Sequence, residues 1–153
     1  MNPLVIDSSV AVKWLVAEPD SDDADAVRHA IVTGAVAPIA PDWIDAEIGN
    51  ILWQKTRRQG LPAAEAEVRL AKWLAFRIDR TPAADLLPDA LSLALRFGTS
   101  VYDSLYLALS ERESCPFVTA DARLVHAVAA PLAGPVTLKD WAAAHPPPSP
   151  PSP

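Results

Sequence analysis

Short apolar runs alternate along the chain with longer stretches in which apolar residues recur every three or four positions. The short runs predict strands at residues 4–6, 35–38, 78–81, 117–119 and 136–138. The longer stretches predict helices at residues 9–15, 24–32, 42–59, 62–76, 84–97, 100–110 and 123–129. Gly60 and Gly98 follow two of these helices and predict their ends, while Asp42 and Asp45 are interpreted as caps at the start of the third. Pro38 cannot donate to a neighbouring strand, so the second strand is predicted to lie at an edge of the sheet.

Strands that alternate with helices predict an α/β sandwich with a mostly parallel central sheet. The pattern covers residues 1–144, an ordinary length for one domain. Residues 145–153 are nearly all proline and serine, and we expect them to form an extended or disordered tail. No apolar stretch approaches the roughly 18–20 residues that cross a membrane, and the N-terminus lacks a secretory signal pattern, so a cytoplasmic protein without a membrane partner is expected.

Composition excludes several kinds of site. Cys115 is the only cysteine, which excludes an intramolecular disulfide and a zinc site built from cysteines. The three histidines are scattered, with no pair at the spacing of a zinc-binding helix. The net charge of −6 argues against a protein that coats nucleic acid through charge alone. Residues 51–81 nevertheless carry seven bases and three acids, a stretch that suits contact with RNA phosphate or with water equally well.

Four acids are candidates for a shared site. Asp7 and Asp121 each follow a predicted strand directly, and ligands bind at the carboxyl ends of strands in an open parallel sheet. Glu47 and Asp103 lie on predicted helices whose apolar neighbours face the core, so both can point inward. Carboxylates that lie close together repel one another unless a cation neutralises them. Oxygen ligands of this kind suit Mg²⁺ or Mn²⁺.

Each of these acids also has a purely structural interpretation. Asp7 and Asp121 could be helix N-caps, a role that aspartate favours. Asp103 lies three residues after Ser100 and could complete a capping box. Glu47 could be a surface acid at the edge of an apolar stripe. The acids become a site only if the fold brings them together.

The segments that contain these acids occur in a fixed order over most of the chain. They are Val5-Ile6-Asp7-Ser8-Ser9, Glu47-Ile48-Gly49-Asn50, Tyr102-Asp103-Ser104-Leu105-Tyr106-Leu107-Ala108 and Val118-Thr119-Ala120-Asp121. Together they resemble a PIN domain, specifically a VapC-type toxin nuclease, from about residue 3 to about residue 141. Each motif is weak alone, whereas all four in order form a specific signal.

The resemblance implies a PIN-like α/β/α sandwich that acts as a metal-dependent endoribonuclease. It assigns the metal, Mg²⁺ or Mn²⁺, to an acidic quartet: Asp7, Glu47, Asp103 and Asp121. It also implies that Ser8, Asn50 and Thr119 orient those carboxylates from a second layer of contacts.

The same resemblance implies three partners: an RNA substrate, a cognate VapB-type antitoxin, and a second copy of the chain that forms a homodimer through the helical hairpin at residues 42–76. A PIN-like module that binds a partner without cleaving RNA is the alternative. The presence of all four acids argues against it, because a site without catalysis is expected to have lost at least one of them.

Overall fold

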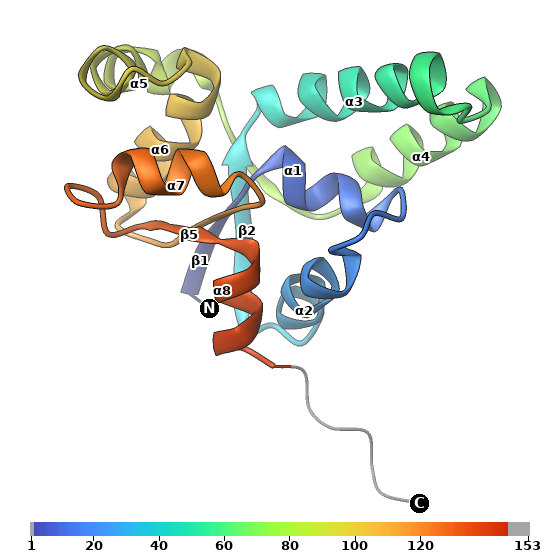
Figure 1. Ribbon diagram of the computed structural model, residues 1–153, viewed down its shortest axis with the longest axis horizontal. Coiled ribbons are helices and arrows are strands. Elements are labelled where there is room, and N and C mark those ends of the chain that lie inside the picture. Colours follow the sequence, from blue (N-terminus) through green and yellow to red (C-terminus); the bar gives the residue numbers. More distant parts are fainter. Residues whose placement is uncertain (1, 147–153) are drawn as a thin grey trace, which may run out of the picture.

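The computed structural model describes residues 2–146, which build a five-stranded parallel sheet with helices on both sides (Figure 1). The strands are β1 (Asn2–Ile6), β2 (Val36–Pro41), β3 (Asp79–Thr81), β4 (Phe117–Thr119) and β5 (Pro135–Thr137). They lie in the order β3-β2-β1-β4-β5, and every neighbouring pair is parallel. The α/β prediction is confirmed. Most of the predicted tail, residues 147–153, lies outside the described residues.

The helices that connect the strands are α1 (Ser8–Ala11), the 3₁₀ helix η1 (Val12–Trp14), α2 (Ser21–Val32), α3 (Trp43–Gln59), α4 (Ala63–Ala75), α5 (Ala83–Phe97), α6 (Val101–Glu113), α7 (Ala122–Val128) and α8 (Leu138–Ala144). In Figure 1, α5 and α6 lie on one side of the β1–β2 pair, and α2 and α4 lie on the other. Within the part of the chain that the structure describes, no helix combines the length and the apolarity of a membrane span.

The prediction that the second strand forms an edge is wrong, because β2 lies between β1 and β3. The sheet tolerates Pro38 since the two partners cover different parts of β2. Pro38 pairs with Leu4 of β1, whereas pairing with β3 begins only at Ile39. The side of Pro38 that faces β3 therefore has no paired strand, and the missing N–H costs the sheet little.

The two central strands and one helix form the middle of the core. Leu4, Val5 and Ile6 of β1 are buried, as are all three residues of β4. Helix α6 packs on β1, β2 and β4 and is buried continuously from Ser104 to Ser110. A strand that is covered on both faces has no polar alternation, which explains the continuous apolar runs in the sequence. The carboxyl ends of β1 and β4 consequently meet against α6.

The interpretation of Asp42 and Asp45 as caps of α3 is wrong, since neither side chain bonds to the start of that helix. Asp42 Oδ1 instead accepts from the backbone N–H of Ala83 at the start of α5, at 2.8 Å. Asp45 accepts from Trp73 Nε1 at 2.7 Å and from Arg80 Nε at 2.8 Å. Both acids therefore fasten α3 to elements that lie far away in the sequence.

Candidate functional site

Asp7 lies at the junction of β1 and α1. Its backbone N–H donates to the Val118 carbonyl at 3.1 Å, which continues the pairing of β1 with β4 beyond the end of β1. Its carbonyl accepts from the amides of Val10 and Ala11 and so begins α1. The carboxylate itself makes no capping bond. The cap interpretation is therefore wrong for Asp7, and its side chain turns toward the end of β4 instead.

Hydroxyl groups hold the Asp7 carboxylate in place. Ser9 Oγ donates to Oδ2 at 2.7 Å, and Thr119 Oγ1 donates to the same oxygen at 2.5 Å. Ser8 Oγ comes only within 3.4 Å of Oδ1, which is long for an O–H···O bond. Sequence reasoning named Ser8 and Thr119 but missed Ser9. The signal for Ser9 was local, because a hydroxyl two residues after an aspartate is well placed to turn back onto it.

Glu47 approaches the same region from α3. Its Oε2 accepts a hydrogen bond from the Tyr106 hydroxyl on α6. Burial raises the pKa of Glu47 to about 7; the bond from Tyr106 opposes this rise, and the negative charges of Asp7 and Asp103 add to it. Sequence reasoning missed Tyr106, since a tyrosine on a buried helix gives no sign of which carboxylate its hydroxyl will meet.

The charge of Asp103 acts on both Asp7 and Glu47, and the charge of Asp7 also acts on Glu47. Burial raises the pKa of Asp7, the bonds from Thr119 and Ser9 lower it, and the charge of Asp103 raises it further. The structure thus brings together three acids from the end of β1, from α3 and from the first turn of α6.

Asp103 and Asp121 both keep the structural role that the sequence allowed. Asp103 forms a capping-box-like pair with Ser100: its N–H donates to Ser100 Oγ at 3.0 Å, and Ser100 Oγ donates to Asp103 Oδ2 at 2.8 Å. Asp121 caps α7, with Oδ1 accepting from the amides of Arg123 and Leu124 at 3.0 and 3.1 Å. Each role uses one carboxylate oxygen, so the other oxygen of each acid stays available to a ligand.

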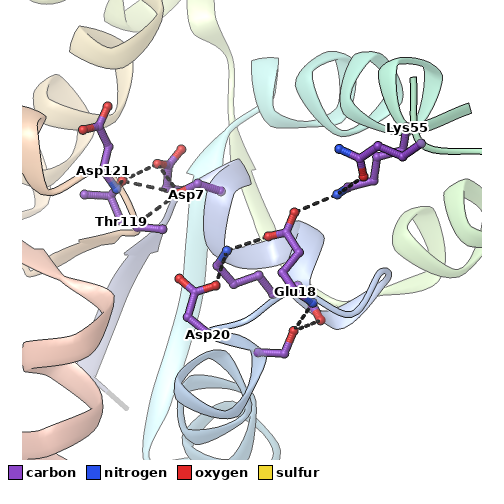
Figure 2. Close-up of polar contacts among 11 residues, drawn as sticks. Asp7, Glu18, Asp20, Lys55, Thr119 and Asp121 are labelled. Atoms are coloured by element: carbon purple, nitrogen blue, oxygen red, sulfur yellow. Dashed lines mark hydrogen bonds and ion pairs between the residues drawn. The ribbon is translucent and has the colours of Figure 1, made fainter. Parts of the chain in front are cut away.

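Thr119 links Asp121 to Asp7, as Figure 2 shows. Its Oγ1 donates to the Asp7 carboxylate and accepts from the backbone N–H of Asp121 at 3.0 Å. Asn50 takes no part in this arrangement. Its side chain is exposed on α3 and makes no side-chain hydrogen bond within residues 2–146. The expected contact of Asn50 with the acids stays a prediction.

The donor chemistry of the four acids fits a hard divalent cation. Asp7 and Glu47 are partly buried oxygen donors whose pKa values are raised first by burial and then by neighbouring carboxylates. A cation would favour the charged form of both acids, and Mg²⁺ and Mn²⁺ prefer oxygen ligands of this kind. Within residues 2–146, however, no three acidic, histidine or cysteine side chains form a ready-made metal cluster. The carboxylates would have to draw together when a cation binds.

A separate ionic cluster lies beside the acids (Figure 2). Lys13 Nζ lies 2.6 Å from Glu18 Oε2 and 2.8 Å from Asp20 Oδ1, and Lys55 Nζ lies 2.7 Å from Glu18 Oε1. Lys55 is thus neutralised inside the protein and is not free to bind phosphate. The idea that the basic stretch at residues 51–81 binds RNA must therefore rest on its other members.

Comparison with known proteins gives a consistent result. The family model described as "PIN domain" matches residues 4–130. Ribonuclease VapC3 of Pyrobaculum aerophilum is 33% identical over 123 residues, which cover 79% of this chain and 91% of that protein. Ribonuclease VapC9 of Mycobacterium tuberculosis is 30% identical over 121 residues, covering 79% and 87%.

Solved structures agree in fold at lower identity. A crystal structure from Pyrobaculum aerophilum has a TM-score of 0.66 at 21% identity and covers 94% of this chain and 88% of that chain. A toxin–antitoxin complex from Klebsiella pneumoniae has a TM-score of 0.56 at 13% identity, with coverage of 88% and 97%. At these identities the structural likeness supports the fold alone.

Proposed function

This chain belongs to the PIN-domain family and has VapC ribonucleases among its relatives, and from that premise we propose that it is a metal-dependent endoribonuclease toxin. The observation that carries the proposal is the convergence of Asp7, Glu47 and Asp103 at the carboxyl end of the sheet, where burial raises the pKa values of Asp7 and Glu47 and the charge of Asp103 raises both further. A site built only for stability would not keep uncompensated carboxylates together.

We assign the cation to Asp7, Glu47, Asp103 and Asp121. When bound, Mg²⁺ or Mn²⁺ would neutralise these acids and supply the Lewis acid that activates water against an RNA phosphodiester. Ser9 and Thr119 fix the orientation of the Asp7 carboxylate, and Tyr106 fixes that of Glu47. Such supporting contacts raise the precision with which a metal is held.

Asp7→Asn tests the assignment directly. The substitution keeps the shape of the side chain but removes a charge, so we expect RNA cleavage to fall by at least about a hundredfold while the fold persists. The measurement is the mapping of new RNA ends after induced expression, supported by cleavage of total RNA by purified protein. Asp25→Asn is the matched control, because Asp25 forms only an exposed ion pair with Arg28. Undiminished cleavage by Asp7→Asn protein would overturn the proposal.

Removal of divalent cations gives an independent test. Excess EDTA is expected to abolish cleavage by the wild-type protein, and added Mg²⁺ or Mn²⁺ is expected to restore it. Restoration by only one of the two ions would identify the metal, and activity that persists in excess EDTA would exclude a metal-dependent reaction.

We propose further that the protein acts in the cytoplasm as a homodimer and that a cognate VapB-type antitoxin neutralises it. The acids attract positive charge, so an arginine-bearing antitoxin segment is expected to enter the site. Replacing Glu47 by Gln in a co-purified complex should then weaken antitoxin binding, as measured by calorimetry. Equal affinity of the wild-type and Glu47→Gln proteins would place the antitoxin elsewhere.

A further inference from the structure

Two aromatic rings stack beside the acidic site. Trp43 is the first residue of α3 and Tyr102 the second residue of α6. Their ring centroids lie 4.8 Å apart with an interplanar angle of 10°. Trp43 is partly buried, whereas 55% of Tyr102 is exposed. Trp43 covers one face of the Tyr102 ring, so the part of Tyr102 that is exposed to solvent lies away from Trp43.

The stack and the acids belong to one arrangement of α3 against α6. Glu47 lies four residues after Trp43, and Tyr106 lies four residues after Tyr102, so each pair shares a helix face. Trp43 contacts Tyr102, and one turn further on, Glu47 accepts from the Tyr106 hydroxyl. The stack therefore stands about one helical turn, roughly 6 Å along each axis, from a carboxylate of the site. Tyr102 also directly precedes Asp103.

Trp43 is not held there by a polar contact. Its indole Nε1 is buried and finds no hydrogen-bond partner within the described part of the chain. A buried tryptophan normally satisfies this N–H, and leaving a donor unpaired is costly. Phenylalanine would fill much of the same space without that cost. What tryptophan adds at this position is the larger flat surface that supports Tyr102.

We propose that Tyr102, supported by Trp43, is a platform on which a nucleobase next to the scissile phosphate stacks. This inference rests on the proposed ribonuclease function. A protein with a net charge of −6 gains little from general attraction to phosphate, so stacking is a suitable source of affinity. Every base has a flat face, and bases of single-stranded RNA are free to stack on aromatic side chains.

The test compares Tyr102→Leu with Tyr102→Phe. Leucine removes the ring, and we expect KM for RNA to rise roughly tenfold or more, with a smaller change in kcat. Phenylalanine keeps the ring and is expected to recover most of the lost affinity. Val32→Ala is the control, because Val32 is an exposed apolar residue on α2, away from the acids. The variants are also compared in thermal unfolding, so that a loss of fold is recognised.

A binding experiment separates stacking from other effects of Tyr102. The probe is a short synthetic RNA centred on the cut site mapped with the wild-type protein. It is bound by the Asp7→Asn protein, in which cleavage is expected to be slow enough for binding to be measured. Removing one base beside the cut should weaken RNA binding by the protein that keeps Tyr102. The same removal should have little further effect on the protein that also carries Tyr102→Leu. Losses of binding free energy that do not add up in this way support the platform.

Two results would overturn the platform without touching the ribonuclease function. One is a wild-type KM and cut-site pattern for the Tyr102→Leu protein. The other is a loss confined to self-association or antitoxin binding, which would make Tyr102 a protein contact. Failure of the proposed function looks different, because the wild-type protein itself would then leave RNA intact.

Discussion

Glu47 and Tyr106 are two residues whose pKa values are raised by the buried, acidic environment of the site. Burial raises the pKa of Glu47 to about 7, and burial together with the charges of Asp7 and Glu47 raises the pKa of Tyr106. The tyrosine therefore stays protonated and keeps donating to Glu47. Without a cation, Glu47 therefore holds its proton to a higher pH in the folded state than an ordinary glutamate does.

This preference predicts the pH dependence of the metal-free protein. The folded state holds the Glu47 proton up to a pH of about 7, whereas the unfolded chain releases it near the ordinary value of 4.5. The contribution of Glu47 to the free energy of unfolding is therefore greatest below about pH 4.5. It decreases as the pH rises toward about 7. Between these two pH values we expect the free energy of unfolding to fall by on the order of 1–3 kcal/mol, measured by denaturant unfolding in EDTA.

The Glu47→Gln protein is the comparison that isolates this group. It should lose part of the pH dependence, and the rest should remain because Asp7 also has a raised pKa and acts in the same direction. Glu67→Gln, which changes an exposed glutamate of α4, should behave as the wild type. An unchanged pH dependence in the Glu47→Gln protein would show that the carboxyl is not strained in the metal-free state.

Individual residues also show where sequence reasoning reached its limit at the site. The strand ends at Asp7 and Asp121 could be predicted, since apolar runs and the rule for parallel sheets place both. The contact of Ser9 with Asp7 had a local signal in the spacing of the two residues, which was missed. The contact of Tyr106 with Glu47 could not be predicted, because it depends on side-chain directions across two helices that meet only in the folded chain.

At the scale of elements, the cluster around Glu18 fastens the η1–α2 connection to α3. The side chains of Lys13 and Lys55 are only 7% and 9% exposed, and Glu18 bonds to both (Figure 2). Glu18→Ala would leave two nearly buried lysines without their shared partner. We expect a loss of about 3 kcal/mol in the free energy of unfolding near neutral pH. Asp25→Ala, which breaks an exposed pair, should cost less than about 1 kcal/mol.

The same cluster has a pH dependence opposite in sign to that of Glu47. Burial raises the pKa of Glu18, but the two lysines outweigh this effect and lower it overall. The contribution of Glu18 to stability is complete above pH 4.5, the ordinary pKa that Glu18 has in the unfolded chain. This contribution is lost as the pH falls below that value. The difference in stability between the wild-type and Glu18→Ala proteins should therefore shrink in acid. A difference that does not change between pH 7 and pH 3 would contradict this role.

Helices and strands were predictable to the extent that their signals are local. Gly60 and Gly98 end α3 and α5 in the left-handed conformation, as the sequence indicated. The interior place of β2 was not predictable, because it depends on where β3 begins to pair. Helix α8 was missed although Thr137 and Asp140 form a capping contact at its start. The strand predicted at residues 136–138 included Leu138, which is the first residue of α8.

At the scale of the whole molecule, exposed apolar side chains mark candidate surfaces for the proposed homodimer. Family resemblance implies the hairpin of α3 and α4, which exposes Trp53, Val68 and Leu74. Helix α5 offers a more continuous surface. Leu87, Leu91 and Leu95 are 45%, 51% and 78% exposed and recur at four-residue intervals along one face. A water-exposed stripe of this kind marks an interaction site more often than a free surface.

We therefore expect Leu91→Glu to convert the proposed dimer into a monomer, because a charge in the middle of the stripe would be buried without a partner. Val68→Glu, on α4, is the matched variant and should leave the dimer intact. Light scattering after size-exclusion chromatography measures both. Dissociation by Val68→Glu alone would place the interface on the hairpin instead. RNA cleavage by the Leu91→Glu monomer would show in addition that the acids of one chain suffice for catalysis, since Asp7, Glu47 and Asp103 all come from the same copy.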